Sequence, residues 1–431
     1  MKKLLALGLA ATVAVAGLGA LAGCGGVKNT DVGDFKVGFI FLHDETSTYD
    51  KNFIEAAEAA TEKMGLTADQ VVFKTGVPEG DECYETACDL AEQGCDLIFA
   101  DSFGHETYIK RAAEEYPLVE FCHATGTQAH TAELSNFHNA FATIYEGRYL
   151  AGIVAGMKLK EMIDDGEITS AEAKIGYVGA FPYAEVISGF TSFYLGARSI
   201  VPEATMTVRY TNSWYDLTAE KETALSLIDA DKCVLISQHA DSLGAPSACE
   251  EEGVPNVSYN GSTESTGPNT YLISSRINWE PYFEYIIGQA QKIYDARRAV
   301  QDEAEAADEQ KDLTTVDVSE FAIPADWTGT IETGSVVLEP MNSKEGVVPE
   351  GAQAKIDEVK AQLVEGTLRV FDTSKFTVDG KTLTSYLADV DDMGDYVGET
   401  EAVKDGYFHE SEYRSAPYFN IIIDGVTSIT E

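Results

Sequence analysis

The stretch KVGFIFLHDETSTYDKNFIEAAEAATEKM, residues 36–64, decides the fold. Residues 36–42 form an apolar run of strand length, and residues 53–64 form a helix rich in Ala and Glu. A strand that is apolar throughout is buried on both faces, which is typical of a parallel sheet covered by helices. The polar loop between the two elements therefore lies at the carboxyl end of a buried strand, where ligands of such sheets bind.

The same alternation of strand and helix continues along the chain and then restarts. Further strands are expected at 71–73, 97–100, 118–122, 175–178, 206–210, 234–237 and 256–259. Helices are expected at 82–93, 106–115, 183–200, 219–229 and 243–252, and a long helix at 140–160 separates the two halves. We therefore predict an α/β fold of two doubly wound parallel-sheet lobes.

The expected lobes are built from separated segments of the chain. Residues 35–145 form the N-terminal lobe, joined by about 265–325, which includes a long helix at 282–307. Residues 146–264 form the second lobe, joined by about 326–431. This last segment changes to polar turns and short strands, expected at 334–338, 367–371 and 419–424, so we expect a β-rich C-terminal segment.

The N-terminus has the order of features that export machinery reads. Lys2 and Lys3 precede an apolar run that is rich in Ala and Gly and ends at small residues before Cys24. The sequence Leu-Ala-Gly-Cys resembles the bacterial lipobox, which implies cleavage before Cys24 and diacylglycerol on its sulfur. A transmembrane anchor is the alternative for a run of this length. Residues 25–34 are small and polar, so they are expected to be a flexible tether to the membrane.

Composition excludes several classes of function. The net charge of −42 argues against nucleic acid as a partner, because a phosphate backbone repels an acidic surface. The sequence contains no nucleophile elbow, phosphate loop or complete dinucleotide fingerprint, so we expect no enzyme activity and no cofactor. Histidines follow several strands, but none stands at a metal-site spacing, and we expect no metal. Cys83 and Cys88 are close enough in one helix for a local disulfide, which the sequence leaves open.

The loops after the predicted strands are polar and aromatic. They comprise residues 43–53, 101–105, 123–126, 180–183, 212–216, 238–242 and 260–263. Rings, carboxylates and amides of this kind stack on and hydrogen-bond a planar polar ligand. Helix capping is an alternative role for Asp44 and Asp50. Packing in the core is an alternative role for Phe53 and Trp214.

Several motifs in order resemble one family, the basic membrane protein family of bacterial substrate-binding lipoproteins. The motifs are the segment 37–53, IYEGRYLAG at 144–152, IGYVG at 175–179, and the glycines at 189 and 196. The family includes purine nucleoside receptors of ABC transporters. The resemblance implies a type I periplasmic-binding-protein fold, with two hinged lobes that close on one small ligand.

The resemblance also implies a set of ligand-binding residues. Two rings sandwich the base in the nucleoside-binding members, and these positions fall on Phe53 and Trp214. On the first loop the family positions fall on Asp44, Tyr49 and Asp50, with Asp50 replacing an amide. The alignment is looser elsewhere, where it gives His123, Asn260 and Arg276 as candidates. Gln238 and Asp241, in the loop after the strand expected at 234–237, complete the set.

Two classes of function remain open at this point. One is a transport receptor that captures a purine nucleoside or nucleobase outside the cytoplasm and delivers it to ABC permease and ATPase subunits. The other is a ligand sensor or surface interaction protein that uses the same fold without transport. A hydrolase acting on nucleosides is a remote third, because no acid-base pair or nucleophile constellation stands out.

Overall fold

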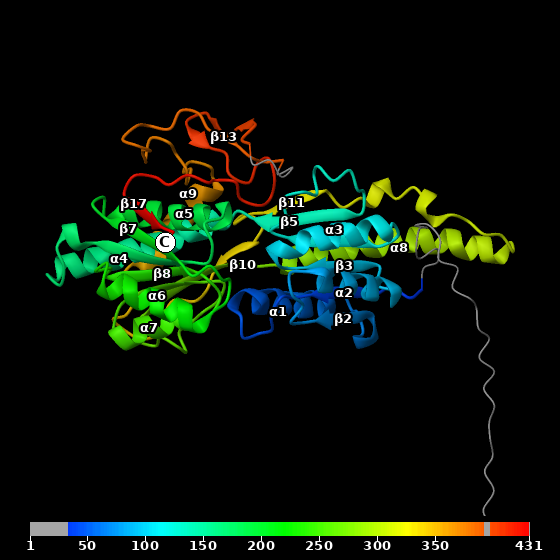
Figure 1. The fold of residues 1–431 in the computed structure, drawn as a ribbon, viewed down its shortest axis with the longest axis horizontal. Coiled ribbons are helices and arrows are strands. Elements are labelled where there is room, and N and C mark those ends of the chain that lie inside the picture. Colours follow the sequence, from blue (N-terminus) through cyan, green and yellow to red (C-terminus); the bar gives the residue numbers. More distant parts are fainter. Residues whose placement is uncertain (1–32, 392–396, 431) are drawn as a thin grey trace, which may run out of the picture.

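The protein consists of two α/β lobes that lie side by side (Figure 1). A computed structural model describes residues 33–391 and 397–430. The predicted export signal, Cys24 and nearly all of the predicted tether lie outside the described residues. Within the described ranges, no helix combines the length and the apolar character needed to cross a bilayer.

The first lobe is a parallel sheet of six strands in the order β11-β5-β4-β3-β1-β2. Its strands are β1 (Val37–Ile40), β2 (Val71–Lys74), β3 (Leu97–Ala100), β4 (Glu120–Ala124), β5 (Phe137–Ala142) and β11 (Asp326–Gly329). Its helices are α1 (Thr48–Lys63), α2 (Asp81–Glu92), α3 (Glu106–Glu115) and α8 (Glu280–Ala306). Apolar side chains on both faces of β1 and β3 are fully buried, as the uninterrupted apolar runs predict.

The second lobe is a sheet of seven strands in the order β12-β10-β9-β8-β6-β7-β17, in which only β12 runs antiparallel among the described strands. Its strands are β6 (Lys174–Gly179), β7 (Thr205–Tyr210), β8 (Leu235–His239), β9 (Asn256–Tyr259), β10 (Tyr271–Ile277), β12 (Val336–Leu338) and β17 (Val426–Ile429). Its helices are α4 (Ile144–Asp164), α5 (Ala184–Ile200), α6 (Leu217–Asp229) and α7 (Gly244–Glu252), with α9 (Ala352–Val364) packed on α4.

Helices α4 and α5 approach each other unusually closely, because a glycine stands on each at the crossing. A Cβ at Gly152 would lie 2.0 Å from the Phe193 carbonyl oxygen, and a Cβ at Gly196 would lie 2.1 Å from the Tyr149 carbonyl oxygen. Both distances are far inside van der Waals contact, so only glycine fits. The glycines of two motifs therefore meet in one helix–helix contact.

Three crossovers join the lobes: β5 into α4, β10 into α8, and β11 into β12. We expected about 265–325 to join the first lobe, but β10 lies in this range and pairs in the second sheet. We expected about 326–431 to join the second lobe, but β11 lies in this range and pairs in the first sheet.

Some sequence-based expectations for the elements were wrong. The helix expected from residue 140 begins at Ile144, because Phe137–Ala142 is strand β5, which the sequence analysis missed together with β10. Both strands carry buried polar residues that hide the apolar pattern. For example, His138 pairs with Glu120 at 3.1 Å, and the Asn139 amide donates to Glu106 at 2.9 Å.

The C-terminal segment differs most from expectation. No strand forms at 367–371 or 419–424, and helix α9 was not predicted. The segment adds β12 and β17 to the second sheet, and its other strands are the two-residue pairs β13 (Leu387–Ala388) with β14 (Thr400–Glu401) and β15 (Val403–Lys404) with β16 (Tyr407–Phe408). It is therefore mostly irregular chain packed on the lobes rather than β-rich.

The cysteines of the described residues are thiols. Cys83 is fully buried inside the first lobe, and the disulfide that the sequence left open between Cys83 and Cys88 is not formed.

Candidate functional site

A pocket lies between the lobes, where the carboxyl ends of the parallel strands of both sheets meet. The open space in the pocket and at its mouth together amounts to about 390 Å³. The first lobe lines it with Leu42, His43, Tyr49, Asp50, Ser102, Phe103 and Thr125. The second lobe lines it with Glu185, Trp214, His239, Asp241, Tyr259 and Asn260.

The loop after β1 places Asp50 at the pocket through a dense set of hydrogen bonds. Ser47 caps helix α1 by accepting from the Asp50 N–H at 3.2 Å, and its hydroxyl donates to the Asp50 carboxylate at 2.5 Å. The His43 N–H donates to the same carboxylate at 2.6 Å, and the His43 ring lies 3.3 Å from it. Burial raises the pKa of Asp50, but the hydrogen bonds from His43 and Ser47 outweigh it, so the pKa falls below its ordinary value. Asp50 is therefore an ionised carboxylate at neutral pH.

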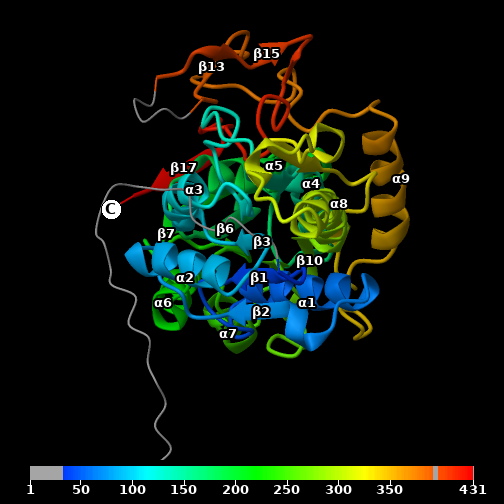
Figure 2. The same cartoon turned by 90° about the vertical axis from the view of Figure 1, so that its right-hand side faces the viewer.

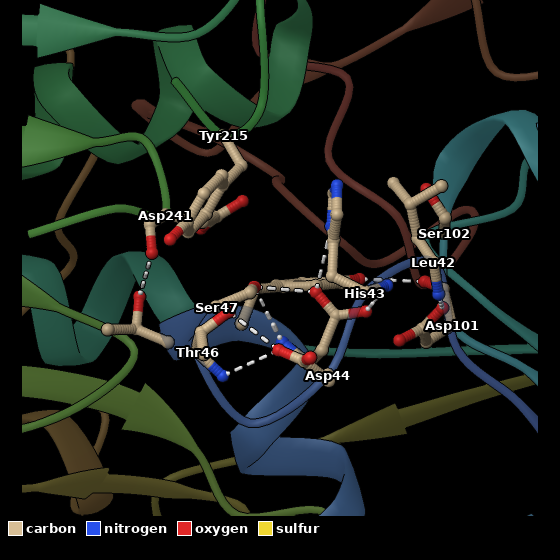
Figure 3. Close-up of polar contacts among 12 residues, drawn as sticks. Leu42, His43, Asp44, Thr46, Ser47, Asp101, Ser102, Tyr215 and Asp241 are labelled. Carbon is tan, nitrogen blue, oxygen red and sulfur yellow. Dashed lines mark hydrogen bonds and ion pairs between the residues drawn. The ribbon is translucent and has the colours of Figure 1, made fainter. Parts of the chain in front are cut away.

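Asp101 directly follows the last residue of β3, and Figure 3 shows it beside Leu42. It is fully buried, and one of its carboxyl oxygens accepts from the Leu42 N–H at 3.1 Å. Burial, and then the charge of Asp50, raise the pKa of Asp101 well above its ordinary value. The two acids therefore divide their roles: Asp101 keeps its proton, while Asp50 carries the negative charge that faces the pocket.

The second lobe contributes acids and amides from the ends of β8 and β9. The Asn260 side-chain amide donates to the Asp241 carboxyl at 3.3 Å. Burial raises the pKa of Asp241, and the neighbouring acids Glu220, Asp50 and Glu185 raise it further. The His239 ring lies 3.4 Å from the Glu185 carboxylate.

Two residues that line the pocket have a strained backbone. Thr125 and Asn260 follow β4 and β9 with φ of 65° and 64°, in the left-handed region that non-glycine residues rarely adopt. Such conformations cost about 1–3 kcal/mol each and concentrate at ligand sites. Both residues with this unusual backbone conformation thus lie at strand ends that line the pocket.

The lobes touch each other around the pocket, so the structure is a closed arrangement. The Thr48 N–H and hydroxyl donate to the Asp241 carbonyl oxygen at 3.0 and 3.2 Å. The rings of His43 and Tyr215 lie 5.5 Å apart across the cleft, and Figure 3 shows Tyr215 and Asp241 reaching the first loop from the second lobe.

The structure brings five of the ten predicted ligand-binding residues to the pocket. These are Tyr49, Asp50, Trp214, Asp241 and Asn260. The Tyr49 hydroxyl donates to the Asp101 carbonyl oxygen at 2.8 Å, which fixes the ring against the first lobe. The Trp214 ring is half-buried beside Phe181, at a centroid distance of 5.2 Å.

The other five predicted residues are not brought to the pocket, and their contacts are structural. Asp44 accepts from the Thr46 N–H on the surface, and Phe53 is buried with its ring stacked on Trp279 at 4.4 Å. The remaining three lie behind the strand ends or at a crossover, with these partners: His123 with the Ser102 carbonyl oxygen, Gln238 with the Asn256 amide, and Arg276 with Glu339 and Asn52. In this arrangement, Phe53 therefore does not line the pocket opposite Trp214.

The sequence analysis missed other residues that line the pocket. His43, Ser102, Phe103, Thr125 and His239 stand in loops that it singled out, so their position was predictable although their role was not. Tyr259 was not a candidate because it is the last residue of a strand, and only the residues that follow strands were considered. Glu185 was not a candidate because it lies in the first turn of helix α5, beyond the loop that precedes it.

The chemistry of the pocket is acidic and aromatic. Asp50, Glu185 and Asp241 line it, and among the described residues that line it there is no Lys or Arg. Rings of Tyr49, Trp214 and Tyr259 supply flat apolar surface. Acceptors and flat rings suit a planar ligand with N–H and O–H donors and disfavour a phosphate.

Among the described residues, one group of acids could hold a metal ion, and it lies outside the pocket. Oxygen atoms of Asp389, Asp391 and Glu399 lie within 4.8 Å of one another. Exposed acidic groups are common without an ion, and this one stands next to residues 392–396, outside the described ranges.

Residues 39–296 match the Bmp family, described as ABC transporter substrate-binding protein PnrA-like. A purine-binding protein of Brucella abortus is 32% identical over 253 residues, which cover 58% of this chain and 66% of that protein. A protein of Haloferax volcanii, named as a candidate ABC transporter glucose-binding protein (TsgA13), is 32% identical over 254 residues, which cover 59% of this chain and 57% of that protein. The chain thus matches less than two thirds of the length of either relative.

Solved structures of solute-binding proteins share the fold. One from Conexibacter woesei aligns with a TM-score of 0.56 at 21% identity, covering 78% of this chain and 98% of that one. Another, from Aeropyrum pernix, aligns with a TM-score of 0.58 at 17% identity, covering 78% and 93%. The two-lobed periplasmic-binding-protein fold expected from the sequence is confirmed.

Proposed function

The chain belongs to the Bmp family of PnrA-like ABC transporter substrate-binding proteins, and we propose that it captures a purine nucleoside or nucleobase for an ABC importer. The family is one of binding proteins and not of enzymes, in agreement with the sequence analysis. The observation that carries the choice of ligand is the pocket, in which the Trp214 ring stands among three carboxyl groups.

The pocket supports a purine through two kinds of contact. Stacking of a base on an aromatic ring contributes on the order of 1–3 kcal/mol, and Trp214 offers such a ring. Asp50 is ionised and accepts hydrogen bonds from amino or hydroxyl groups, whereas Asp241, with its raised pKa, can also donate to a ring nitrogen when protonated. The purine-binding relative supports the same class of ligand.

Capture would be a shift between open and closed lobes. The contacts of Thr48 with Asp241 and of His43 with Tyr215 cross the cleft and form only when the lobes are closed. A ligand that touches both lobes favours the closed state by its extra affinity for that state. Permease and ATPase subunits are the proposed partners, since they would recognise the closed form.

The place of action is proposed to be the outer face of the cytoplasmic membrane, with lipid on Cys24 as the anchor. The experiment is expression of wild type and Cys24→Ser, followed by membrane fractionation and mass spectrometry of the processed N-terminus. Wild type should be found in the membrane fraction with an acylated Cys24, and Cys24→Ser should be released. An unmodified Cys24 in the wild type would refute the anchor.

A thermal-shift panel tests the choice of ligand. Purine nucleosides, nucleobases, glucose and amino acids are compared, and a bound ligand raises the melting temperature in proportion to the logarithm of its concentration over Kd. A purine compound should give the largest shift. A shift with glucose alone would place this chain with its Haloferax relative and refute the purine proposal. Labelled adenosine recovered intact from the complex is the expected result of binding without hydrolysis.

A further inference from the structure

The last part of the chain, after helix α9, lies against both lobes. We call residues 365–391 and 397–430 the C-terminal strap. Figures 1 and 2 show this orange and red segment beside helix α5, on one side of the two sheets. The match to the family ends at residue 296, so the strap is an element that the family match does not describe.

The strap is anchored on the second lobe. Strand β17 pairs with β7 in the second sheet, and the Met206 N–H of β7 donates to the Gly425 carbonyl oxygen at 2.9 Å. The Phe371 ring packs on Tyr145 of α4 at a centroid distance of 5.3 Å and stacks on Phe419 at 4.4 Å. Because the strap shares a sheet and a ring cluster with the second lobe, it should move with that lobe.

The strap meets the first lobe at Asp326, the first residue of β11. The buried Ser415 N–H of the strap donates to one oxygen of the Asp326 carboxylate at 2.8 Å. The His130 ring, also from the first lobe, lies 3.4 Å from the other oxygen and helps to fix the carboxylate. Farther along the strap, the Thr131 hydroxyl lies 3.5 Å from the Asp391 carbonyl oxygen. The bond from Ser415 to Asp326 thus joins an element anchored on the second lobe to the first lobe.

The strap also faces the cleft between the lobes. Beside the pocket lies a cavity whose open space, with its mouth, amounts to about 1170 Å³. Phe103 of the first lobe, Tyr183 of the second lobe, and Leu387 and Tyr418 of the strap line this cavity. Phe103 and Glu185 line the pocket as well. The strap therefore connects the two lobes on a side where they come together over the cleft.

We propose that the C-terminal strap holds the two lobes in the closed arrangement, through the bond from Ser415 to Asp326, before any ligand binds. A contact that forms only in the closed state shifts the equilibrium between open and closed lobes toward the closed state. A ligand then binds a protein whose binding-competent state is already populated, which raises its apparent affinity. This inference rests on the proposed opening of the lobes and not on the identity of the ligand.

The test measures the hydrogen exchange of single backbone amides by mass spectrometry, in protein without ligand. The Ser415 amide reports the bond to Asp326. The Thr48 amide reports closure, because Thr48 is the first residue of α1, has no acceptor within the helix, and donates to the Asp241 carbonyl oxygen across the cleft. In Asp326→Ala both amides should exchange at least about fivefold faster than in wild type. This factor corresponds to the loss of one hydrogen bond with a net contribution of about 1 kcal/mol.

Two variants are the matched controls. Asp326→Asn keeps a side-chain oxygen that can accept from Ser415, so both amides should exchange as in wild type. Asp317→Ala removes an exposed carboxylate from the chain just before β11, where Asp317 accepts from the Ser319 N–H at 3.1 Å. It should also leave both amides as in wild type. Asp326 is only half-buried, so the amides of β3 in the first sheet should be unchanged in all variants.

Three results would overturn the inference. If Ser415 exchanges faster in Asp326→Ala while Thr48 does not, or if neither amide changes, the bond does not hold the lobes together. If the amides of β3 accelerate equally, Asp326 supports the fold as a whole rather than the closed arrangement. If Thr48 of wild type exchanges as fast as an unstructured amide, the lobes stand open without ligand. In each case the proposed capture of a ligand is unaffected, because the thermal-shift panel decides it separately.

Discussion

The two aromatic rings that the family resemblance places on the ligand differ in this structure, and paired substitutions distinguish them. Trp214 lines the pocket and is half-buried, whereas Phe53 is fully buried against Trp279. Trp214→Ala removes a ring on which a base can stack, so it should weaken purine binding by about 1–3 kcal/mol, or roughly 5- to 150-fold in Kd. The Trp214 ring contacts mainly Phe181 and Tyr183, so folding should be retained.

Phe53→Leu should have the opposite profile. It replaces a core ring with a smaller apolar side chain, so it should lower the free energy of unfolding by about 1–2 kcal/mol while Kd stays within twofold of wild type. The assays are calorimetry with the strongest purine ligand and urea unfolding of all three proteins. The reasoning is refuted if Trp214→Ala binds as wild type does, or if Phe53→Leu weakens binding without loss of stability.

Three further substitutions test the packing and charges around the site. Glu220 is buried, which raises its pKa to about 7, so its folded form holds a proton that the unfolded form loses near pH 4.5. Glu220 should therefore lower the free energy of unfolding of the wild type as the pH rises from 5 to 8. Glu220→Gln lacks this loss, so over that interval urea unfolding should show its free energy of unfolding rising relative to wild type by at most about 2.5 kcal/mol. Arg148 is fully buried and donates to the Ser258 carbonyl oxygen at 3.0 Å and the Ser237 hydroxyl at 2.7 Å. Arg148→Leu leaves these acceptors unpaired and should lower the free energy of unfolding by about 3 kcal/mol, as measured by urea unfolding, and an unchanged value would refute the pairing. Gly152→Val forces α4 from α5 and should lower the melting temperature sharply, whereas an unchanged value would contradict the close helix contact.

The alternation of strands and helices in the two lobes could be predicted because short apolar runs mark many of the strands. Residues 97–100 and 256–259 were located to the residue, since turn residues bound both runs. Strand β5 was missed because His138 and Asn139 interrupt the apolar pattern. Their burial is compensated by Glu120 and Glu106, which come from distant parts of the sequence.

The site was only half predictable for a related reason. Position after a strand identifies which loops reach the cleft, and this rule found Asp50, Trp214, Asp241 and Asn260. It does not say which way each side chain points. Phe53 lies one helical turn beyond Tyr49, and its ring faces the core. There it stacks on Trp279, which comes from a distant part of the sequence. A further cavity, lined by Phe103, Tyr183 and residues 386–420 of the C-terminal segment, was not predictable, because its C-terminal wall is mostly irregular chain without a periodic pattern.

A crystal structure of the protein with adenosine tests the central claim most directly. The account predicts the purine ring in the pocket, with its face against Trp214 and its polar edge within hydrogen-bond distance of Asp50, Asp241 or Asn260. A ligand bound elsewhere, or a base that makes no contact with Trp214 and these three side chains, would contradict it.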